Sequence, residues 1–208
     1  MHAALRGVFA MTILTLLGSQ ALAQPAKIDP DWPCQQIKTP TFSLAAVWAG
    51  PPLDLDSEAW RNESDVADLE AKMAQRRVPI ADVESAIKDF KAKAGPDANA
   101  KLLRAFAAAF EDLTQQRSQV IEGLERFGRK ENALADRIRK ENDAVQAASD
   151  QKSVSQTAPG VGSRDKLLWD IRIYHDRRQT ASYVCEVPTL IEQRIGEIAR
   201  AVQSAVAP

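Results

Sequence analysis

A regular repeat of apolar residues is the feature that most constrains the fold of this chain. From Leu103 onward the spacing alternates between three and four residues for about six repeats, as in a helix that packs on another helix along one stripe. We call this stripe the seam, and its apolar residues are Leu103, Phe106, Phe110, Leu113, Val120, Leu124, Phe127, Leu134, Ile138 and Val145. The seam predicts one long helix from about Asp97 to the start of a polar segment at residue 149.

Two seam positions are polar and two glycines lie close to the seam. Arg117 and Glu131 stand where apolar residues are expected. They either set the register or the oligomeric state, as single polar core positions can, or mark a partly hydrated stretch. Gly123 and Gly128 each cost a helix about 1 kcal/mol relative to alanine, yet the register continues across them, which favours one helix over two.

Further helices are predicted from capping residues and breakers. We expect two short helices, from Ser57 to about Arg77 and from Ile80 to Ala94, since Pro79 and Gly95-Pro96 stop them. Residues 149–163 are small and polar and predict a loop. A last helix is expected from Arg164 to about Ser204, with a kink caused by Pro188. Its apolar stripe is predicted to contain Leu168, Ile171, Tyr174, Val184, Val187, Ile191, Ile195, Ile198 and Val202.

These elements predict an all-α fold. Two long helices joined by one loop form a long antiparallel helical hairpin, which is accompanied by two shorter helices and an extended N-terminal arm. We divide the chain into residues 1–23, 24–56 and 57–208, which are a signal peptide, a Pro-rich extended arm and a helical domain with the long hairpin. Disorder is the alternative for the arm, but its tryptophans and aliphatic residues favour an ordered segment that lies on the helices.

The first 23 residues have the pattern of a cleaved export signal. Arg6 precedes an apolar run from Gly7 to Leu17, which is too short to span a bilayer, and Ala21-Leu22-Ala23 is a small-x-small cleavage site. The mature chain is then expected to begin at Gln24 and to lie in the periplasm.

The two cysteines, Cys34 and Cys185, are far apart in the sequence. An even number of cysteines in an exported protein predicts a structural disulfide, and the spacing excludes a CxxC redox pair. If the hairpin turns near residue 157, Cys185 faces about residue 129 of the outgoing helix. The arm is then expected to cross beside Gly123 and Gly128, because their missing side chains permit a close approach.

Charge and composition disfavour several classes of function. With 27 Lys and Arg against 28 Asp and Glu, the chain has no basic excess for binding nucleic acid or anionic lipid. After the signal is removed, no apolar stretch is long enough to insert into a membrane. A single mature histidine and two distant cysteines predict no metal site, and the absence of a Gly-rich phosphate loop predicts no nucleotide cofactor.

No catalytic residue is predicted. His175 stands next to Asp176, but no nucleophile signature accompanies it, and a partly buried histidine on a helix face is the preferred interpretation. The alternative is a periplasmic enzyme, or an accessory subunit of one, whose site would gather His175, a carboxylate and Trp32 or Trp48. A third possibility is a sensor with a closed apolar cavity for a small ligand.

Two segments carry a resemblance to a known family. Asp31-Trp32-Pro33-Cys34 and the stretch YVCEVPTLIEQR at 183–194 resemble a family of uncharacterised exported helical proteins from proteobacteria. The resemblance spans most of the mature chain and implies a periplasmic location, but no activity. Leu113-Thr114-Gln115-Gln116 is similar to the LTxxQ motif of periplasmic helical chaperones, with Arg117 in place of the final glutamine.

These observations favour a non-enzymatic periplasmic scaffold, adaptor or chaperone-like protein that binds a protein partner. The two short helices are too short to cover the whole seam at about 1.5 Å per residue. Leu134, Ile138 and Val145 are therefore the expected partner-binding residues, for another protein or for a second copy of this chain.

Overall fold

The computed structural model of the chain describes residues 29–55, 57–152 and 161–206. Within these ranges the fold is all-α and contains no β-strand. The α-helices there are α1 (Ser64–Ala74), α2 (Ile80–Lys93), α3 (Ala98–Lys152), α4 (Val161–Cys185) and α5 (Val187–Val206). Short 3-10 turns occur at η1 (Leu44–Ala46), η2 (Ala59–Asn62) and η3 (Gly95–Asp97). The expected signal peptide and residues 153–160 of the expected loop lie outside the described residues.

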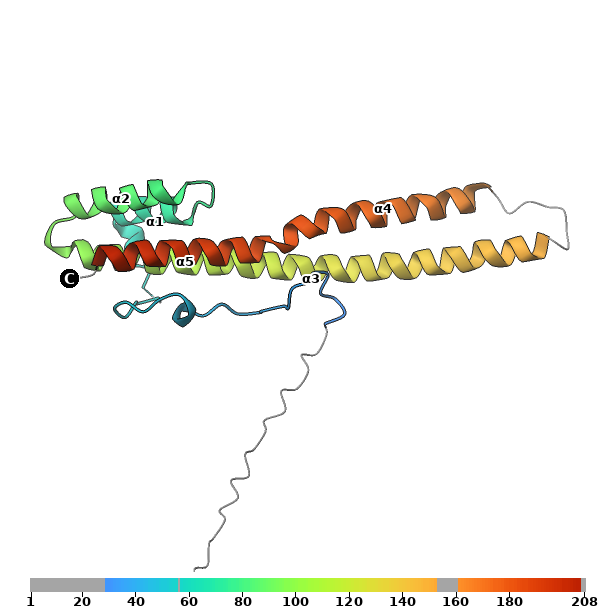
Figure 1. Cartoon of the computed structure of the whole chain (residues 1–208), viewed down its shortest axis with the longest axis horizontal. Coiled ribbons are helices and arrows are strands. Elements are labelled where there is room, and N and C mark those ends of the chain that lie inside the picture. Colours follow the sequence, from blue (N-terminus) through green and yellow to red (C-terminus); the bar gives the residue numbers. More distant parts are fainter. Residues whose placement is uncertain (1–28, 56, 153–160, 207–208) are drawn as a thin grey trace, which may run out of the picture.

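The long helix α3 follows the predicted seam. It is continuous over 55 residues, which corresponds to about 80 Å, and it runs the length of the molecule in Figure 1. Six of the ten apolar seam residues are more than nine-tenths buried, and so are Arg117 and Glu131. The single helix across Gly123 and Gly128 is therefore confirmed, and it continues to Lys152, a few residues further than predicted.

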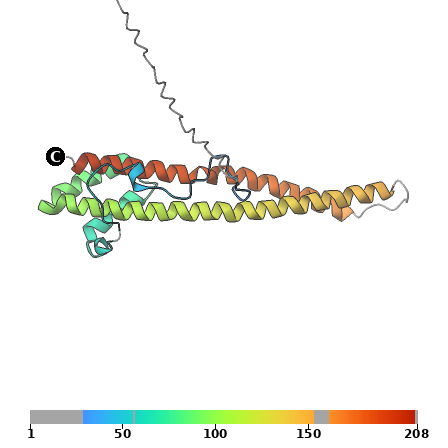
Figure 2. The ribbon, with the colours of Figure 1, turned by 90° about the horizontal axis from the view of Figure 1, so that it is seen from below.

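Both C-terminal helices pack against α3. In Figures 1 and 2, α5 lies along the part of α3 that is nearest its start, and α4 lies along the rest. The expected kink is a break at Glu186 between α4 and α5, because Pro188 has no N–H to donate and its ring displaces the carbonyl of Val184. The turn of the expected hairpin falls on residues 153–160, so the hairpin itself stays a prediction.

The main core lies where α1 and α2 pack against α3 and α5. Helix α2 begins and ends close to its predicted bounds, but α1 is shorter than predicted at both ends. It begins at Ser64 because Glu63 is extended and its carboxylate accepts a hydrogen bond from Arg104 of α3 at 2.9 Å. It ends at Ala74, where Arg194 of α5 donates to the carbonyls of Met73 and Gln75, both at 3.2 Å. Two tertiary contacts thus decide the helix bounds.

The described part of the arm, residues 29–55, is an ordered extended segment that lies on the helices (Figure 1). Its aromatic side chains reach the core: the Trp48 ring lies 4.7 Å from the Phe106 ring, and the Phe42 ring lies 6.5 Å from the Phe110 ring. Gln203 of α5 donates to the carbonyl of Val47 at 3.1 Å. These contacts hold the arm without any regular secondary structure of its own beyond one 3-10 turn.

Candidate functional site

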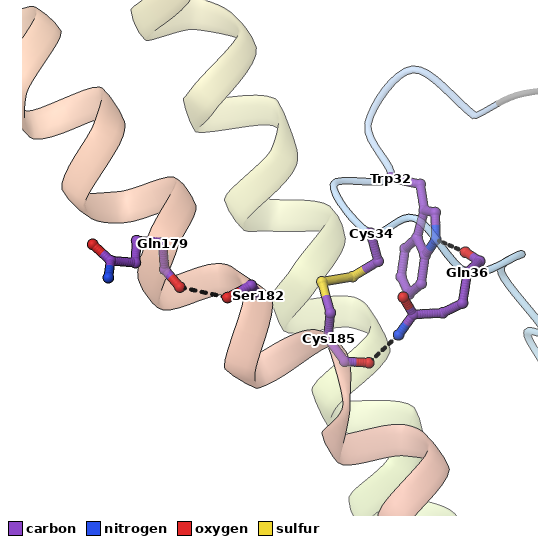
Figure 3. The surroundings of a disulfide bond; sticks show 6 residues. All are labelled: Trp32, Cys34, Gln36, Gln179, Ser182 and Cys185. Atoms are coloured by element: carbon purple, nitrogen blue, oxygen red, sulfur yellow. Dashed lines mark hydrogen bonds between the residues drawn. A yellow bond between two sulfur atoms is a disulfide. The ribbon is translucent and has the colours of Figure 1, made fainter.

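The predicted disulfide is confirmed. Cys34 of the arm and Cys185, the last residue of α4, are bonded, with their Cα atoms 5.6 Å apart. Around this bond the Trp32 indole donates to the carbonyl of Gln36 at 2.7 Å, and the Gln36 side chain donates to the carbonyl of Cys185 (Figure 3). The bond therefore joins the arm to the break between α4 and α5 and closes a sequence separation of 151 residues.

The arm crosses α3 at Gly128. A Cβ atom added there would lie 1.8 Å from the carbonyl oxygen of Asp31, so no side chain fits between the arm and the helix. One turn further along, Asn132 donates to the carbonyl of Pro30 at 2.8 Å. The prediction of a close approach is confirmed for Gly128. It is wrong for Gly123, where an added Cβ meets only the Arg126 side chain, at 3.8 Å.

The polar seam residue Arg117 binds the arm. It is 2% exposed, and its Nε donates to Glu192 of α5 at 2.6 Å. Its Nη2 and Nη1 donate to the carbonyls of Thr39 and Pro40 at 2.6 and 3.3 Å. All of these partners belong to the same chain, so Arg117 joins α3, α5 and the arm at a buried point.

The second polar seam residue, Glu131, is buried with incomplete hydrogen bonding. Its side chain is 8% exposed, and Oε1 accepts one bond from Arg177 of α4 at 3.3 Å. Its Oε2 is buried and has no hydrogen-bond partner among the described residues. Buried carboxylate oxygens are normally paired, because leaving one unpaired costs its desolvation free energy.

Glu131 contributes to a cleft of about 550 Å³ beside the disulfide. The arm forms one wall with Trp32 and Cys34, and α3 and α4 form the others. On the α4 side, Arg178 donates to the Tyr174 hydroxyl at 3.2 Å and lies over the Tyr174 ring at 5.7 Å. We call this the disulfide cleft, and its other residues beyond the arm are Phe127, Gly128, Asn132, Ala181, Ser182 and Cys185 of the helices and Glu186 at the break.

His175 does not line the disulfide cleft. Its side chain is exposed, contrary to the expectation of a partly buried histidine, and its ring meets the edge of Tyr174 at 6.0 Å. Because Tyr174 faces the cleft, its neighbour on the helix must point elsewhere. The disulfide cleft therefore contains Trp32 and a carboxylate, as expected for the enzyme alternative, but it does not contain His175.

The expected partner-binding residues lie under α4. Leu134 and Val145 are 4% and 9% exposed, and Ile138 is partly buried. Close by, Arg137 donates to Asp170 of α4 at 2.9 Å, and this hydrogen bond lowers the pKa of the Asp170 carboxyl. A partner could reach these seam residues only if α4 moved away, so docking there stays a prediction that the closed arrangement does not favour.

The exposed aromatic side chains among the described residues of α4 lie on the face that points away from α3, which we call the outward face of α4. Trp169 and Tyr183 are 62% and 68% exposed. Leu168 and Val184 were predicted to lie on the buried stripe, but they are exposed too. The inner positions belong instead to Leu167, Asp170, Ala181 and Cys185. Because Cys185 must face the arm, residues reached from it in steps of three or four positions share its face of the helix. This rule predicts the inner positions that the structure shows.

A buried carboxylate that the sequence did not indicate lies at the other end of the molecule. Glu70 of α1 is 8% exposed and lines a groove with Asp112 of α3. Burial raises the pKa of the Glu70 carboxyl, and the nearby Asp112 raises it further, while Arg61 acts in the opposite direction. Asp112 accepts a hydrogen bond from Gln116 at 2.9 Å.

Within the described residues, no helix is both long and apolar enough to cross a bilayer, and no group of three or more metal-ligating side chains occurs. Comparisons with protein-family models, with curated proteins and with solved structures found nothing that matches this chain.

Proposed function

We propose that this chain is a non-enzymatic, exported helical scaffold or adaptor that binds a protein partner in the periplasm. In this proposal the outward face of α4 is the docking surface, in place of the seam residues Leu134, Ile138 and Val145. The alternative of an enzyme centred on His175 has less support, because that side chain is exposed and lies outside the disulfide cleft.

The observation that carries this proposal is a pair of exposed aromatic residues on one face of α4. Trp169 and Tyr183 are 14 residues apart, which brings them to the same side of the helix about 21 Å apart. Arg172 and Asp176 are exposed between them. Trp, Tyr and Arg are the residue types that dominate the binding energy of protein interfaces. A solvent-facing stripe of this composition suits a partner helix better than it suits a catalytic site.

The disulfide supports the proposed location. Disulfides persist in oxidising compartments such as the bacterial periplasm, and Cys34–Cys185 is a disulfide in this chain. The bond joins the arm to the end of α4, Arg117 donates to the arm from α3, and Gly128 lets the arm lie close to α3. We propose that the long hairpin is completed through residues 153–160, so that α3 and α4 form a stiff coiled-coil rod on which the outward face of α4 is displayed.

A paired variant tests this function. The full exported chain is tagged at its C-terminus and purified from periplasmic extract as wild type and as Trp169→Ser with Tyr183→Ser. We expect the double variant to lose a specific co-purifying protein by at least about thirtyfold, which corresponds to the roughly 2 kcal/mol of one interface hot spot. Its melting temperature should be unchanged, because both side chains are already in solvent.

The matched control is Ile37→Ser with Leu190→Ser, which removes two exposed apolar side chains, 80% and 50% exposed, outside α4. This control should retain the partner. Equal capture by the wild type and the Trp169 and Tyr183 double variant would contradict the proposal. Light scattering on the same samples shows whether the bound protein is a second copy of this chain.

A further inference from the structure

We propose that the disulfide cleft is a binding site for a small organic cation, namely an ammonium or amidinium group carried on an aromatic or apolar body. This site is separate from the protein-docking face of α4, and the inference does not depend on the proposed function.

One carboxylate of the disulfide cleft is incompletely hydrogen-bonded within the described residues. Glu131 lines the cleft, its side chain is nine-tenths buried, and its Oε2 has no hydrogen-bond partner among the described residues. The other oxygen receives one bond, from Arg177, whose side chain is 51% exposed. The negative charge is thus only partly neutralised within the chain. A donor that carries a positive charge is the chemical group that best completes such a site.

The walls of the cleft contain aromatic rings and carboxylates. Trp32 and Tyr174 contribute aromatic rings, and Trp is the strongest partner for a cation held over a ring face. The indole N–H of Trp32 is already used by the carbonyl of Gln36, which holds the ring beside the disulfide (Figure 3). Among the described residues that line the cleft, the charged ones are the carboxylates Glu131 and Glu186 and the cation Arg178. The walls therefore favour a ligand of positive charge.

The cleft has the size of a small-molecule site, and the fixed arm forms part of its wall. Its volume of about 550 Å³ lies within the range of small-molecule sites. Its shape depends on the arm, which the Cys34–Cys185 bond and the close approach at Gly128 hold in place. A preformed site of this kind loses little entropy when a ligand binds.

Calorimetry with a matched pair of probes tests the inference. The probes are 2-phenylethylamine and 2-phenylethanol, which share a body and differ in whether they carry the cationic group. We expect the oxidised wild-type protein to bind the amine at least about tenfold more tightly than the alcohol, as for a charge-assisted hydrogen bond in a buried site. Equal binding of the two probes, or no heat with the amine at millimolar concentration, would overturn the proposal.

Two variants locate the binding. Glu131→Gln keeps the shape of the side chain and removes its charge, and it should weaken amine binding at least about tenfold. Glu141→Gln is the control, because Glu141 also lies on α3 and has a buried Oε2 with no hydrogen-bond partner in the part of the chain that the structure describes, but it does not line the cleft. It should leave the affinity within about twofold. Loss of affinity in both variants, or in neither, would contradict the assignment to Glu131.

A second variant, with the opposite expected effect on amine affinity, tests the inference if Glu131→Gln does not fold. Arg177→Gln removes the internal cation that competes for Glu131, and Arg177 is half exposed, so the fold should tolerate the change. We expect it to bind the amine more tightly than the wild type does. Unchanged or weaker binding would overturn the role of Glu131 as the cation site.

Discussion

At the scale of single residues, the buried side chains of Arg117 and Arg194 donate hydrogen bonds to backbone carbonyls of distant segments. Arg117 donates to the arm and Arg194 donates to the end of α1, so each guanidinium replaces the caps and turns that the sequence lacks at those points. Burial lowers the pKa of Arg194, but an arginine stays charged at any physiological pH. These two side chains therefore act as structural connectors.

Glu70 is different, because it forms no ion pair among the described residues, and burial, followed by the charge of Asp112, raises the pKa of its carboxyl. The folded chain then holds this proton more tightly than the unfolded chain does. The contribution of Glu70 to stability is fully present below its unfolded pKa and is lost as the pH rises through its folded pKa. We expect Glu70→Gln to melt at a higher temperature than the wild type at pH 7.5, and this difference to shrink towards pH 4.

The measurement is the difference in melting temperature between variant and wild type across that range, since other carboxyl groups affect both proteins equally. Glu122→Gln, at an exposed position on α3, is the control and should show no such trend. A Glu70→Gln protein that is less stable than the wild type at pH 7.5 would mean that the charged carboxylate is favourably bound.

At the scale of elements, the parts that could be predicted are those that local pattern determines. The seam is a repeat along one helix, so α3 followed from periodicity alone, and the break before Pro188 followed from the geometry of proline. The bounds of α1 could not be predicted, because they depend on Arg104 and Arg194, which are distant in sequence. Apolar residues occur on both faces of α4, so its inner face could not be assigned from hydrophobicity.

The candidate site was also predictable only in part, where a local pattern determines it. The disulfide, the arm crossing at Gly128 and the polar seam positions Arg117 and Glu131 were all visible as departures from a pattern. The cleft itself was not, because it exists only where the arm, α3 and α4 meet. Trp169 and Tyr183 were missed because exposure of an aromatic residue depends on helix rotation, which Cys185 determines.

The two glycines of α3 provide a matched prediction. Gly128→Ala places a Cβ against the carbonyl of Asp31, so the arm must shift, and we expect a loss of about 2 kcal/mol or more in unfolding free energy. Gly123→Ala has free space, and the better helix propensity of alanine should stabilise the protein by about 0.5–1 kcal/mol. Urea unfolding measures both.

Opposite signs for the two variants are the essential outcome. If Gly128→Ala were as stable as the wild type, or more so, the arm would not lie against α3 in solution.

At the scale of the whole molecule, the described chain is an elongated frame in which a compact core at one end continues into a two-helix rod. The described part of the arm begins near the middle of the molecule and runs along α3 and α5 towards the core (Figure 1), and the disulfide joins it to the point where α4 becomes α5. This arrangement leaves the disulfide cleft and the outward face of α4 as separate surfaces, which is why a small cation and a protein partner can both be proposed.

Removing the disulfide should loosen the arm. Cys34→Ser with Cys185→Ser is expected to lower the unfolding free energy by about 5 kcal/mol in the chain-entropy treatment of a separation of 151 residues. Amide exchange should rise mainly in the arm before Thr39, because Arg117 and Trp48 still hold the later part. Unchanged exchange in this segment would show that other contacts suffice to hold the arm.

Photo-crosslinking in cells that export the chain tests the central claim, that the outward face of α4 docks a protein. A photoreactive phenylalanine analogue replaces Trp169 or Tyr183 in one set of cells, and Leu134 or Leu190 in another. We expect a crosslink to one defined protein from positions 169 and 183, and none from 134 or 190. Crosslinks from position 134 alone, or none from 169 and 183, would contradict it.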